Sequence, residues 1–411
     1  MHSRPIPAAR HDIVIVGGGL VGASLAIALD RLGLDVGMVE ATPSGSLPPV
    51  FDERNLSFAA GTVNALTALG VMQKLQTPPA PIRRIHVSRN GDFGRVKLDA
   101  ADYGREAFGQ VVVARAFGDA LEARLSELPR LTRYRPARFV GIEDADAGYR
   151  AIRIDGGVSS DTRHIEARLI VAADGTRSSI RDALGIAAEE HDYAQTLLIA
   201  RIRAQRPPDG TAYERFGNDG PTALLPRGDR HFGVIHGVAQ GDADAVMKSS
   251  DEEWLTRLQS AFGWRVGKLL SSGPRSAYPA LRVVAARITD ERAVLIGNAA
   301  QTIHPIGAQG FNLGLRDALT LAELIGKRGG DPGSDSLLNT YVERRHEDRM
   351  QTLAFSDGLA KVTANDSALL RPLRSLGLIA ADALPSAQAM LVGGAMGYRA
   401  DVPALCREVT Q

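Results

Sequence analysis

The first apolar segment of the chain is a short run of branched side chains that stops at a cluster of glycines. Residues Asp12 to Val16 form a β-branched run, which is typical of a strand buried on both faces of a parallel sheet. Alanines and leucines then recur at helical spacing from Ala23 to Leu32, and a second strand-like run covers Asp35 to Glu40. The order strand, glycine turn, helix, strand predicts a Rossmann-type unit.

The glycine turn has the spacing of a dinucleotide-binding motif. Gly17, Gly19 and Gly22 fit the pattern G-x-G-x-x-G. The first glycine makes the tight turn, the second lets the backbone approach a pyrophosphate, and the third lets helix and strand pack closely. Glu40 follows about 20 residues later, where a carboxylate accepts hydrogen bonds from ribose hydroxyls. The motif predicts a dinucleotide site and leaves FAD and NAD both open.

Two later segments repeat the passage from a buried strand into a polar turn. The run Leu169 to Ala172 leads into Asp174 and Gly175, and the run Ala293 to Ile296 leads into a longer polar turn. A helix with an apolar stripe follows that turn, and Asn312 is expected to be its N-cap. The conspicuous residues of the longer turn are Gly297, Asn298, His304, Pro305, Gly307, Gln309 and Gly310.

Between these segments, polar and apolar residues alternate with a period of two, which predicts strands. Ile82 to Val87 and Gly94 to Leu98 flank Asn90-Gly91, a strong signal for a hairpin turn. Such strands predict a mainly antiparallel sheet that forms one wall of a ligand pocket. The further segments with this alternation are Thr196 to Arg203, Thr211 to Phe216, Thr222 to Leu225 and Phe232 to Val238.

The last part of the chain is expected to be helical. The tail from Leu369 to Tyr398 predicts helices interrupted by Pro372 and Pro385, which cap the core in preference to contacting a membrane. Before it, three residues recur at helical spacing and predict a solvated or interface face of a helix. These residues are Tyr341, Arg345 and Asp348.

Composition narrows the possible functions. At 411 residues the chain predicts two or three structural units, and a net charge of +1 without blocks of like charge argues against nucleic acid as a partner. The single cysteine, Cys406, excludes an internal disulfide, a cysteine metal cluster and a redox-active cysteine pair. No metal site is predicted. The apolar run before the glycines is too short for a signal peptide, so a cytoplasmic location is expected.

The three motifs together resemble those of the flavoprotein aromatic hydroxylases of the p-hydroxybenzoate hydroxylase fold. They occur in the family order and span residues 12 to 320. Within this family the chain resembles the ubiquinone-biosynthesis branch, and the string from Gly297 to Asn312 is most similar to the 2-octaprenyl-6-methoxyphenol hydroxylases. The usual Asp of the third motif is Asn298 here, a change that this branch tolerates, and an amide carbonyl can still accept a hydrogen bond.

The resemblance implies an α/β fold with three parts. A Rossmann-type FAD-binding domain is expected from the discontinuous segments 1–75, 105–185 and 285–345. A mainly antiparallel substrate domain is expected from 76–104 and 186–284, where Tyr213 and Pro226 match family segments, and a C-terminal helical region from 346–411. The residues expected to bind FAD are Gly17, Gly19, Gly22, Glu40, Arg54, Asp174, Gly175, Asn298, Gly310, Phe311 and Asn312.

The reaction implied by the resemblance is aromatic hydroxylation. FAD, with NAD(P)H as the transient reductant and O₂, would hydroxylate a polyprenylated phenol, on the pattern of 2-octaprenyl-6-methoxyphenol at ring position 1. The alternatives are another ring position in the same pathway and a non-catalytic FAD-binding component of a quinone-synthesis complex. His304, with Pro305, is a candidate for assisting phenol deprotonation, although a structural role for His304 is favoured. Other ubiquinone-biosynthesis proteins and the surface of the inner membrane are possible partners, and the oligomeric state stays open.

Other flavin and nucleotide enzymes lack support in the sequence. A disulfide reductase needs a cysteine pair and a second complete strand, glycine and helix unit, and a flavin halogenase needs a paired-tryptophan motif. Trp254 and Trp264 stand in an unrelated context. A simple NAD dehydrogenase leaves the second and third motifs unexplained.

Overall fold

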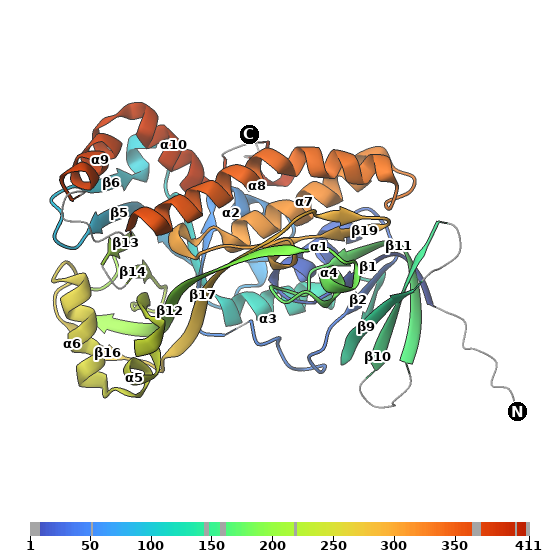
Figure 1. Ribbon diagram of the computed structural model, residues 1–411, viewed down its shortest axis with the longest axis horizontal. Helices are drawn as coiled ribbons and strands as arrows, with labels where there is room; N and C mark the ends of the chain where they lie inside the picture. Colours follow the sequence, from blue (N-terminus) through green and yellow to red (C-terminus); the bar gives the residue numbers. More distant parts are fainter. Residues whose placement is uncertain are drawn as a thin grey trace, which may run out of the picture.

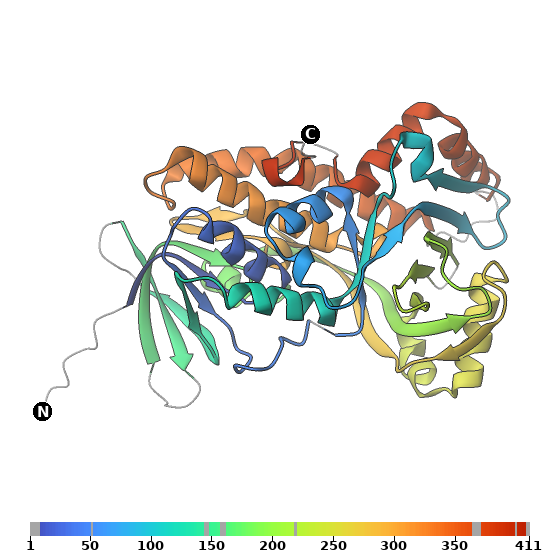
Figure 2. The ribbon, with the colours of Figure 1, turned by 180° about the vertical axis from the view of Figure 1, so that it is seen from behind.

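The computed structural model describes residues 9–50, 52–143, 148–156, 162–217, 220–363, 371–398 and 401–407. Within these residues the chain forms two large sheets at opposite ends of an elongated molecule, with the helices α7 (Gly310–Arg328) and α8 (Asp335–Thr363) along one side (Figure 1). Helix α1 (Leu20–Asp30) packs against both α7 and α3 (Ala114–Leu125) (Figure 2). The predicted α/β fold with a Rossmann-type part, an antiparallel part and a C-terminal helical region is confirmed.

The first sheet contains the Rossmann-type unit. Its strand order is β18-β19-β11-β1-β2-β8, and neighbours from β19 to β8 run parallel. The core residues Ile13 to Val16 of β1 are between 0 and 4% exposed, so the predicted strand buried on both faces is confirmed. Helix α1 begins at Leu20, earlier than predicted, because it starts directly from the glycine turn. The strands are β1 (Ala9–Val16), β2 (Val36–Val39), β8 (Leu131–Tyr134), β9 (Ala137–Glu143), β10 (Arg150–Gly156), β11 (Thr162–Ala172), β18 (Thr289–Asp290) and β19 (Ala293–Leu295).

The second sheet has the order β20-β17-β12-β15-β14-β13-β5-β6, with β16 paired to β12. Its pairs are antiparallel except β13 with β5, so the predicted mainly antiparallel sheet and the hairpin at Asn90-Gly91 are confirmed. The strands are β5 (Arg84–Arg89), β6 (Arg95–Asp99), β12 (Ala188–Ala204), β13 (Thr211–Phe216), β14 (Pro221–Pro226), β15 (Phe232–Ala239), β16 (Leu269–Ser272), β17 (Ser276–Ala285) and β20 (Gln301–Thr302).

A small third sheet and several helices join the two large ones. Its order is β3-β7-β4, and its antiparallel strands connect the nucleotide part to the hairpin of β5 and β6. The bounds are β3 (Asn55–Ala59), β4 (Ala80–Ile82), β7 (Gly109–Val113), α1 (Leu20–Asp30), α2 (Ala60–Ala68), α3 (Ala114–Leu125), α4 (Ser179–Ala183), α5 (Ala243–Lys248) and α6 (Asp251–Phe262).

Helices α7 (Gly310–Arg328) and α8 (Asp335–Thr363) are joined by a buried ionic network. Tyr341 and Arg345 are 0% exposed and Asp348 is 1% exposed, so of the two predicted alternatives the solvated face is wrong, and these residues lie at the interface of α8 with α7. Their charges are paired across the two helices, since Arg345 Nε donates to Asp317 at 2.7 Å and Arg316 Nε donates to Asp348 at 2.7 Å. Burial alone would raise the pKa of Asp348, but Arg316 and Arg345 lower it to about 2.

Two C-terminal helices lie over the hairpin of β5 and β6. Helix α9 (Arg371–Ala383) contacts β6, and α10 (Pro385–Met396) contacts α9 and α2, so the tail covers the core (Figure 1). Pro385 begins α10 as predicted, Pro372 lies in the first turn of α9, and Leu369 is outside the described residues. Among the described helices none alone has the length and apolarity to cross a membrane, whereas the bent pair Ser375–Ala383 and Pro385–Met396 meets those criteria jointly.

Candidate active site

The three predicted motifs meet at one edge of the first sheet. In the parallel register Val16 of β1 is the partner of Ala172 of β11, which is in turn the partner of Leu295 of β19. The turns that follow these three strands therefore lie next to one another, at the carboxyl ends where open α/β sheets bind ligands. We call this place the nucleotide crevice; it is formed by residues 17–22, 173–178 and 297–298.

Close backbone contacts explain two of the three glycines of the first motif. A Cβ atom on Gly17, whose φ is +107°, would come within 2.3 Å of the Ala173 carbonyl oxygen. A Cβ atom on Gly22 would come within 1.9 Å of the Gly17 carbonyl oxygen. At Gly19 it would meet only a Val50 methyl at 3.7 Å, so neighbouring protein atoms do not require this glycine. The open space at Gly19 fits the close approach of a pyrophosphate to the backbone.

The N-terminus of α1 faces the nucleotide crevice without a capping side chain. Its N-cap is Gly19, no side chain accepts a hydrogen bond there, and the first turn contains no acidic residue. The first N–H groups of a helix have no partner within the helix, and together with the helix dipole they attract an anion. This end of α1 is therefore suited to a phosphate group.

Glu40 lies where the ribose of a dinucleotide is expected. Its Oε2 accepts the Gly18 N–H at 2.8 Å and its Oε1 accepts the Thr42 N–H at 2.8 Å, so the backbone orients the carboxylate. Each oxygen can accept a further hydrogen bond. A cavity beside Glu40 is lined by Met38, Leu121, Arg133 and Arg135, among others. Its apolar and polar walls are suited to the adenosine part of a ligand.

The second motif places a free carboxylate oxygen in the nucleotide crevice. Asp174 accepts hydrogen bonds at Oδ2 from the Ser179 hydroxyl at 3.0 Å and the Ile180 N–H at 3.3 Å. Its Oδ1 is buried and has no hydrogen-bond partner among the described residues. Gly175 follows with a φ of +88°, which turns the chain away from the strand. An unpaired buried carboxylate oxygen is costly, and a hydrogen-bond donor of a bound ligand would satisfy it.

The ionic network between α7 and α8 stabilises the third motif through Asp317. Asp317 Oδ2 accepts the Gly297 N–H at 3.1 Å and the Gln301 amide at 2.6 Å, while its Oδ1 accepts from Arg345. Asn298 is exposed, and its side chain forms no hydrogen bond within the described part of the chain. Its amide is available to a ligand in the nucleotide crevice.

The start of α7 provides a second uncapped helix end. The N-cap is Gln309, and the prediction that Asn312 is the N-cap is wrong because Asn312 lies inside the first turn. Its side chain is buried and bonds Ala59, Thr62, Ser57 and Ala308, which ties α7 to β3 and α2. The Phe311 ring packs against Phe58 and Phe117 at 5.2 and 5.3 Å between centroids. For Gly310, Phe311 and Asn312, the groups left to a ligand are the backbone N–H groups.

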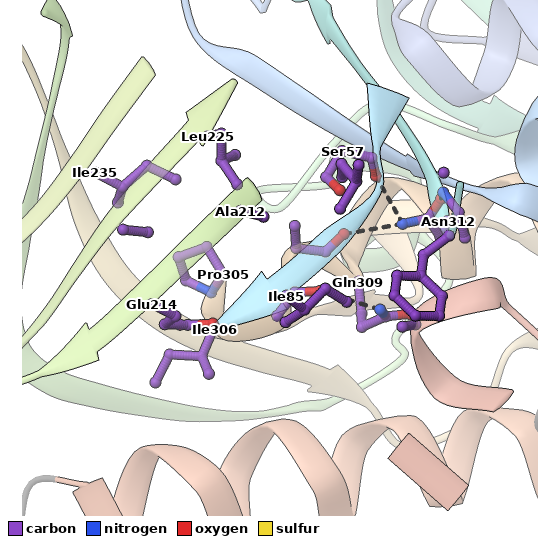
Figure 3. A pocket seen from close by; sticks show the side chains of 18 of the residues that line it. Ser57, Ile85, Ala212, Glu214, Leu225, Ile235, Pro305, Ile306, Gln309 and Asn312 are labelled. Atoms are coloured by element: carbon purple, nitrogen blue, oxygen red, sulfur yellow. Dashed lines mark hydrogen bonds between the residues drawn. The ribbon is translucent and has the colours of Figure 1, made fainter. Parts of the chain in front are cut away.

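An apolar cavity lies between the second sheet and the start of α7 (Figure 3). The segment from Pro305 to Gln309 forms one side of it, and strands β13 and β14 form another. Figure 3 shows Glu214 beside Pro305 and Ile306, with Gln309 and Asn312 farther along the cavity. Other residues that line it are Ile82, Ile85, Phe108, Leu197, Ala212, Tyr213, Ala223, Leu225, Ile235 and Ala395.

His304 and Pro305 differ in their relation to this cavity. Pro305 lines it, but His304 is 1% exposed and is not among the lining residues. The His304 Nδ1 accepts the Ile306 N–H at 3.3 Å, its ring meets the Tyr193 ring edge-on at 4.8 Å, and burial lowers its pKa to about 4. This environment favours a neutral histidine that supports the loop, and a catalytic role stays a prediction.

Arg54 has strong partners within the protein. Its Nε and Nη2 donate to both oxygens of Asp52 at 2.8 and 2.9 Å, and its guanidinium stacks on the Tyr278 ring at 4.4 Å. The Tyr278 hydroxyl donates to the same carboxylate. A contact of Arg54 with FAD stays a prediction, and this structure shows the arginine as part of a cluster that links β3 to β17.

The described residues fit FAD. Two uncapped helix ends, the free Asp174 Oδ1, the exposed Asn298 amide and the ordered Glu40 carboxylate lie on the three converging turns. A ligand with an adenosine, a pyrophosphate and a large anionic ring system uses donors and acceptors of these kinds. The sequence analysis did not identify Glu214 as a site residue. The signal that could have identified it is a carboxylate at a position of an alternating strand where the side chain faces inward.

Comparisons with known proteins agree with this geometry. The sequence profile of the FAD binding domain family matches residues 10–356. Ubiquinone hydroxylase UbiL of Rhodospirillum rubrum is 31% identical over 390 residues, or 94% of this chain and 89% of that protein. The 3-demethoxyubiquinol 3-hydroxylase of Escherichia coli (strain K12) is 29% identical over 90% of this chain and 94% of its own length. The solved p-nitrophenol 4-monooxygenase PnpA of Pseudomonas putida DLL-E4 shares the fold with a TM-score of 0.78, at 18% identity over 96% of this chain and 99% of its own.

Proposed function

We propose a specific reaction from the premise that this chain belongs to the FAD binding domain family, with ubiquinone-biosynthesis hydroxylases as its relatives. The chain is a flavoprotein monooxygenase with FAD as cofactor and NAD(P)H as the usual reductant of its family. The proposed reaction is hydroxylation of a polyprenylated phenol in ubiquinone biosynthesis, 2-octaprenyl-6-methoxyphenol. The new hydroxyl group is placed at position 1 in the numbering of the quinone ring, the carbon para to the phenol hydroxyl.

The observation that carries this proposal is the apolar cavity at the start of α7. Its walls are mostly aliphatic and aromatic, as a methoxyphenol ring requires, and Gln309 and Asn312 place it beside the uncapped helix end. Bound FAD, reduced by NAD(P)H, supplies the activated oxygen. The chain itself positions the phenol, keeps water away through its apolar walls, and offers the N–H groups of Gly310 and Phe311 to negative charge.

The choice of ring position 1 is supported by the string from Gly297 to Asn312, which borders the cavity with its last residues. Of the two relatives, UbiL has no ring position in its name and the Escherichia coli protein is named as a 3-hydroxylase, so the family alone supports only the coarser assignment. The identity of the substrate and its prenyl length therefore belong to the proposal.

We also propose that the protein lies in the cytoplasm, peripheral to the inner membrane. Large apolar side chains are exposed on α9, on α10 and at the residue between them: Leu376 is 56%, Met390 is 64% and Leu384 is 52% exposed. In α10, Ala395 lines the cavity, so the exposed apolar helices and the cavity adjoin. A polyprenyl chain has to come from lipid, and apolar side chains at the surface favour contact with a bilayer.

Genetic complementation tests the reaction. The gene is expressed in strains that each lack one quinone-ring hydroxylase, and the accumulated intermediates are identified by mass spectrometry. We expect rescue of the strain that lacks hydroxylation at position 1, with loss of its phenolic intermediate. Rescue of another strain alone would move the reaction to that position, and rescue of none by a flavin-loaded protein would favour a non-catalytic role. Fractionation of the rescued cells at low salt is expected to place the protein with the membranes.

A further inference from the structure

Glu214 is a carboxylate on an otherwise apolar part of the second sheet. Its neighbours on the same face of β13, Ala212 and Phe216, are 9% and 3% exposed. Its partners across the sheet are Val87 of β5 and Ala223 of β14. An ionisable group in such a place is costly unless a partner or a ligand engages it. Its side chain lines the cavity, where a ligand would reach it (Figure 3).

The groups around Glu214 do not neutralise its charge. Burial raises the pKa of Glu214 to about 7, and the nearby Gly307 N–H opposes the rise. The next residue on β13, Arg215, donates instead to the Phe262 carbonyl and the Asn90 side chain. No cation of the described part of the chain contributes to the pKa of Glu214.

The other titratable groups near this wall are engaged elsewhere. His304, in the loop before Pro305, has its pKa lowered to about 4 by burial and accepts from Ile306. From α8, Asp357 accepts the Tyr193 hydroxyl at 2.9 Å. Tyr213 occupies the alternate face of β13, where its ring packs against Phe262. Glu214 is thus the carboxylate that the cavity lining offers to a ligand.

Resting on the proposed function, we propose that Glu214 is the catalytic base that accepts the proton of the substrate's phenol hydroxyl. In this step the phenol O–H bond breaks, a Glu214 Oε–H bond forms, and the electron pair stays on the phenol oxygen. The phenolate donates electron density into the ring as the ring carbon takes up the hydroxyl group that the cofactor supplies from O₂ and NAD(P)H. That carbon then loses its C–H proton to a water molecule, the phenol oxygen takes a proton back from Glu214, and the carboxylate is regenerated.

The geometry also orients the substrate. A phenol hydroxyl at Glu214 lies against the segment Pro305 to Gly307, while Gln309 and Asn312 line the cavity farther along, next to the start of α7. The ring then lies between β13 and the uncapped helix end. A carboxylate accepts several hydrogen bonds, so the Gly307 N–H and the phenol can be bound together.

The test uses the oxidised, FAD-loaded protein and a 2-methoxyphenol with one prenyl unit at position 6. The pH dependence of product formation between about pH 6 and about pH 8.5, with NAD(P)H and O₂ supplied, reports whether hydroxylation needs an ionised base. For the wild type, we expect product formation to rise with pH through this range, because burial raises the pKa of Glu214 to about 7 and only the carboxylate can accept the phenol proton. In Glu214→Gln we expect product formation about 100-fold lower and without this rise, while flavin content and binding of the phenol to the oxidised protein are retained.

Glu190→Gln is the matched control, because Glu190 is an exposed residue of strand β12. It should behave as the wild type. Equal product formation by Glu214→Gln and wild type at every pH would overturn the role, as would wild-type product formation that does not change with pH. If Glu214→Gln does not fold, the wild-type pH profile decides alone. A wild type that neither binds nor hydroxylates the phenol would contradict the proposed function itself.

Discussion

The nucleotide crevice is lined mainly by backbone groups, whereas the apolar cavity beside β13 is lined mainly by side chains. In the crevice, Gly17 and Gly22 are required by contacts of 2.3 and 1.9 Å to carbonyl oxygens, and an uncapped helix end supplies the donors. In the cavity, the chemistry depends on one carboxylate, Glu214, among apolar residues from several strands. A site made of backbone groups is determined by one short segment of the sequence. A site made of side chains depends on how strands that are distant in the sequence assemble.

The largest expected effect is a loss of stability when the buried ionic network between α7 and α8, which holds the third motif, is broken at Asp317. Asp317→Ala leaves Arg345 buried beside Asp348 alone and frees the Gly297 N–H, so we expect a loss of about 4 kcal/mol in the free energy of unfolding. Urea denaturation measures it. Glu343→Gln, on the exposed face of the same helix α8 as Arg345, should change stability by less than about 0.5 kcal/mol. A loss below about 1 kcal/mol for Asp317→Ala would show that the network does not support the third motif.

In the nucleotide crevice we expect a smaller loss of stability but a complete loss of bound flavin. The added methyl group of Gly22→Ala would lie 1.9 Å from the Gly17 oxygen, so α1 must move away from β1. We expect a loss of about 1–3 kcal/mol in stability and a protein without flavin absorbance. The comparison is Gly358→Ala on α8, where a Cβ atom meets nothing within 4 Å, and this variant should stay yellow. A yellow Gly22→Ala protein would contradict the backbone description of the crevice.

The smallest effect is expected for a single side chain of the crevice. Asn298 is exposed and lies next to backbone donors that remain in place, so Asn298→Ala should weaken FAD binding by about 1 kcal/mol, the worth of one hydrogen bond. Titration of the apoprotein with FAD, followed by flavin fluorescence, gives the affinity. Asn298→Asp keeps an acceptor oxygen at this position and should bind FAD as well as the wild type. Loss of all binding in Asn298→Ala would mean that the crevice depends on this side chain as strongly as on its glycines.

Much of the fold could be predicted because its signals are local. The β-branched run of β1, the glycine spacing, and the alternation in β13 and β15 each lie within one segment, and the structure contains all of them. The hairpin turn at Asn90-Gly91 is equally local. Start and end positions shifted by a few residues, as at α1, because turn geometry and tertiary packing decide where a helix begins.

The failures concern residues whose partners are far away in the sequence. Arg345 and Asp348 have the spacing of a solvated face, and their burial follows from Asp317 and Arg316, which lie on another helix. Asn312 has the composition of an N-cap, but contacts to β3 and α2 place it inside the helix. In the sequence, Glu214 looks like any other charged residue of an alternating strand. Its place in the cavity depends on β14 and the loop at Pro305, which are separate segments of the chain.

The third motif belongs to both large sheets at once. It leaves β19 in the first sheet, pairs with β17 through β20 in the second, and enters α7 directly afterwards. The separation between the dinucleotide and the aromatic ring is therefore set by a short length of covalent chain. Rocking of one sheet against the other would carry both ligands along with this chain, so the flavin and the phenol keep their mutual alignment while the rest of the molecule moves.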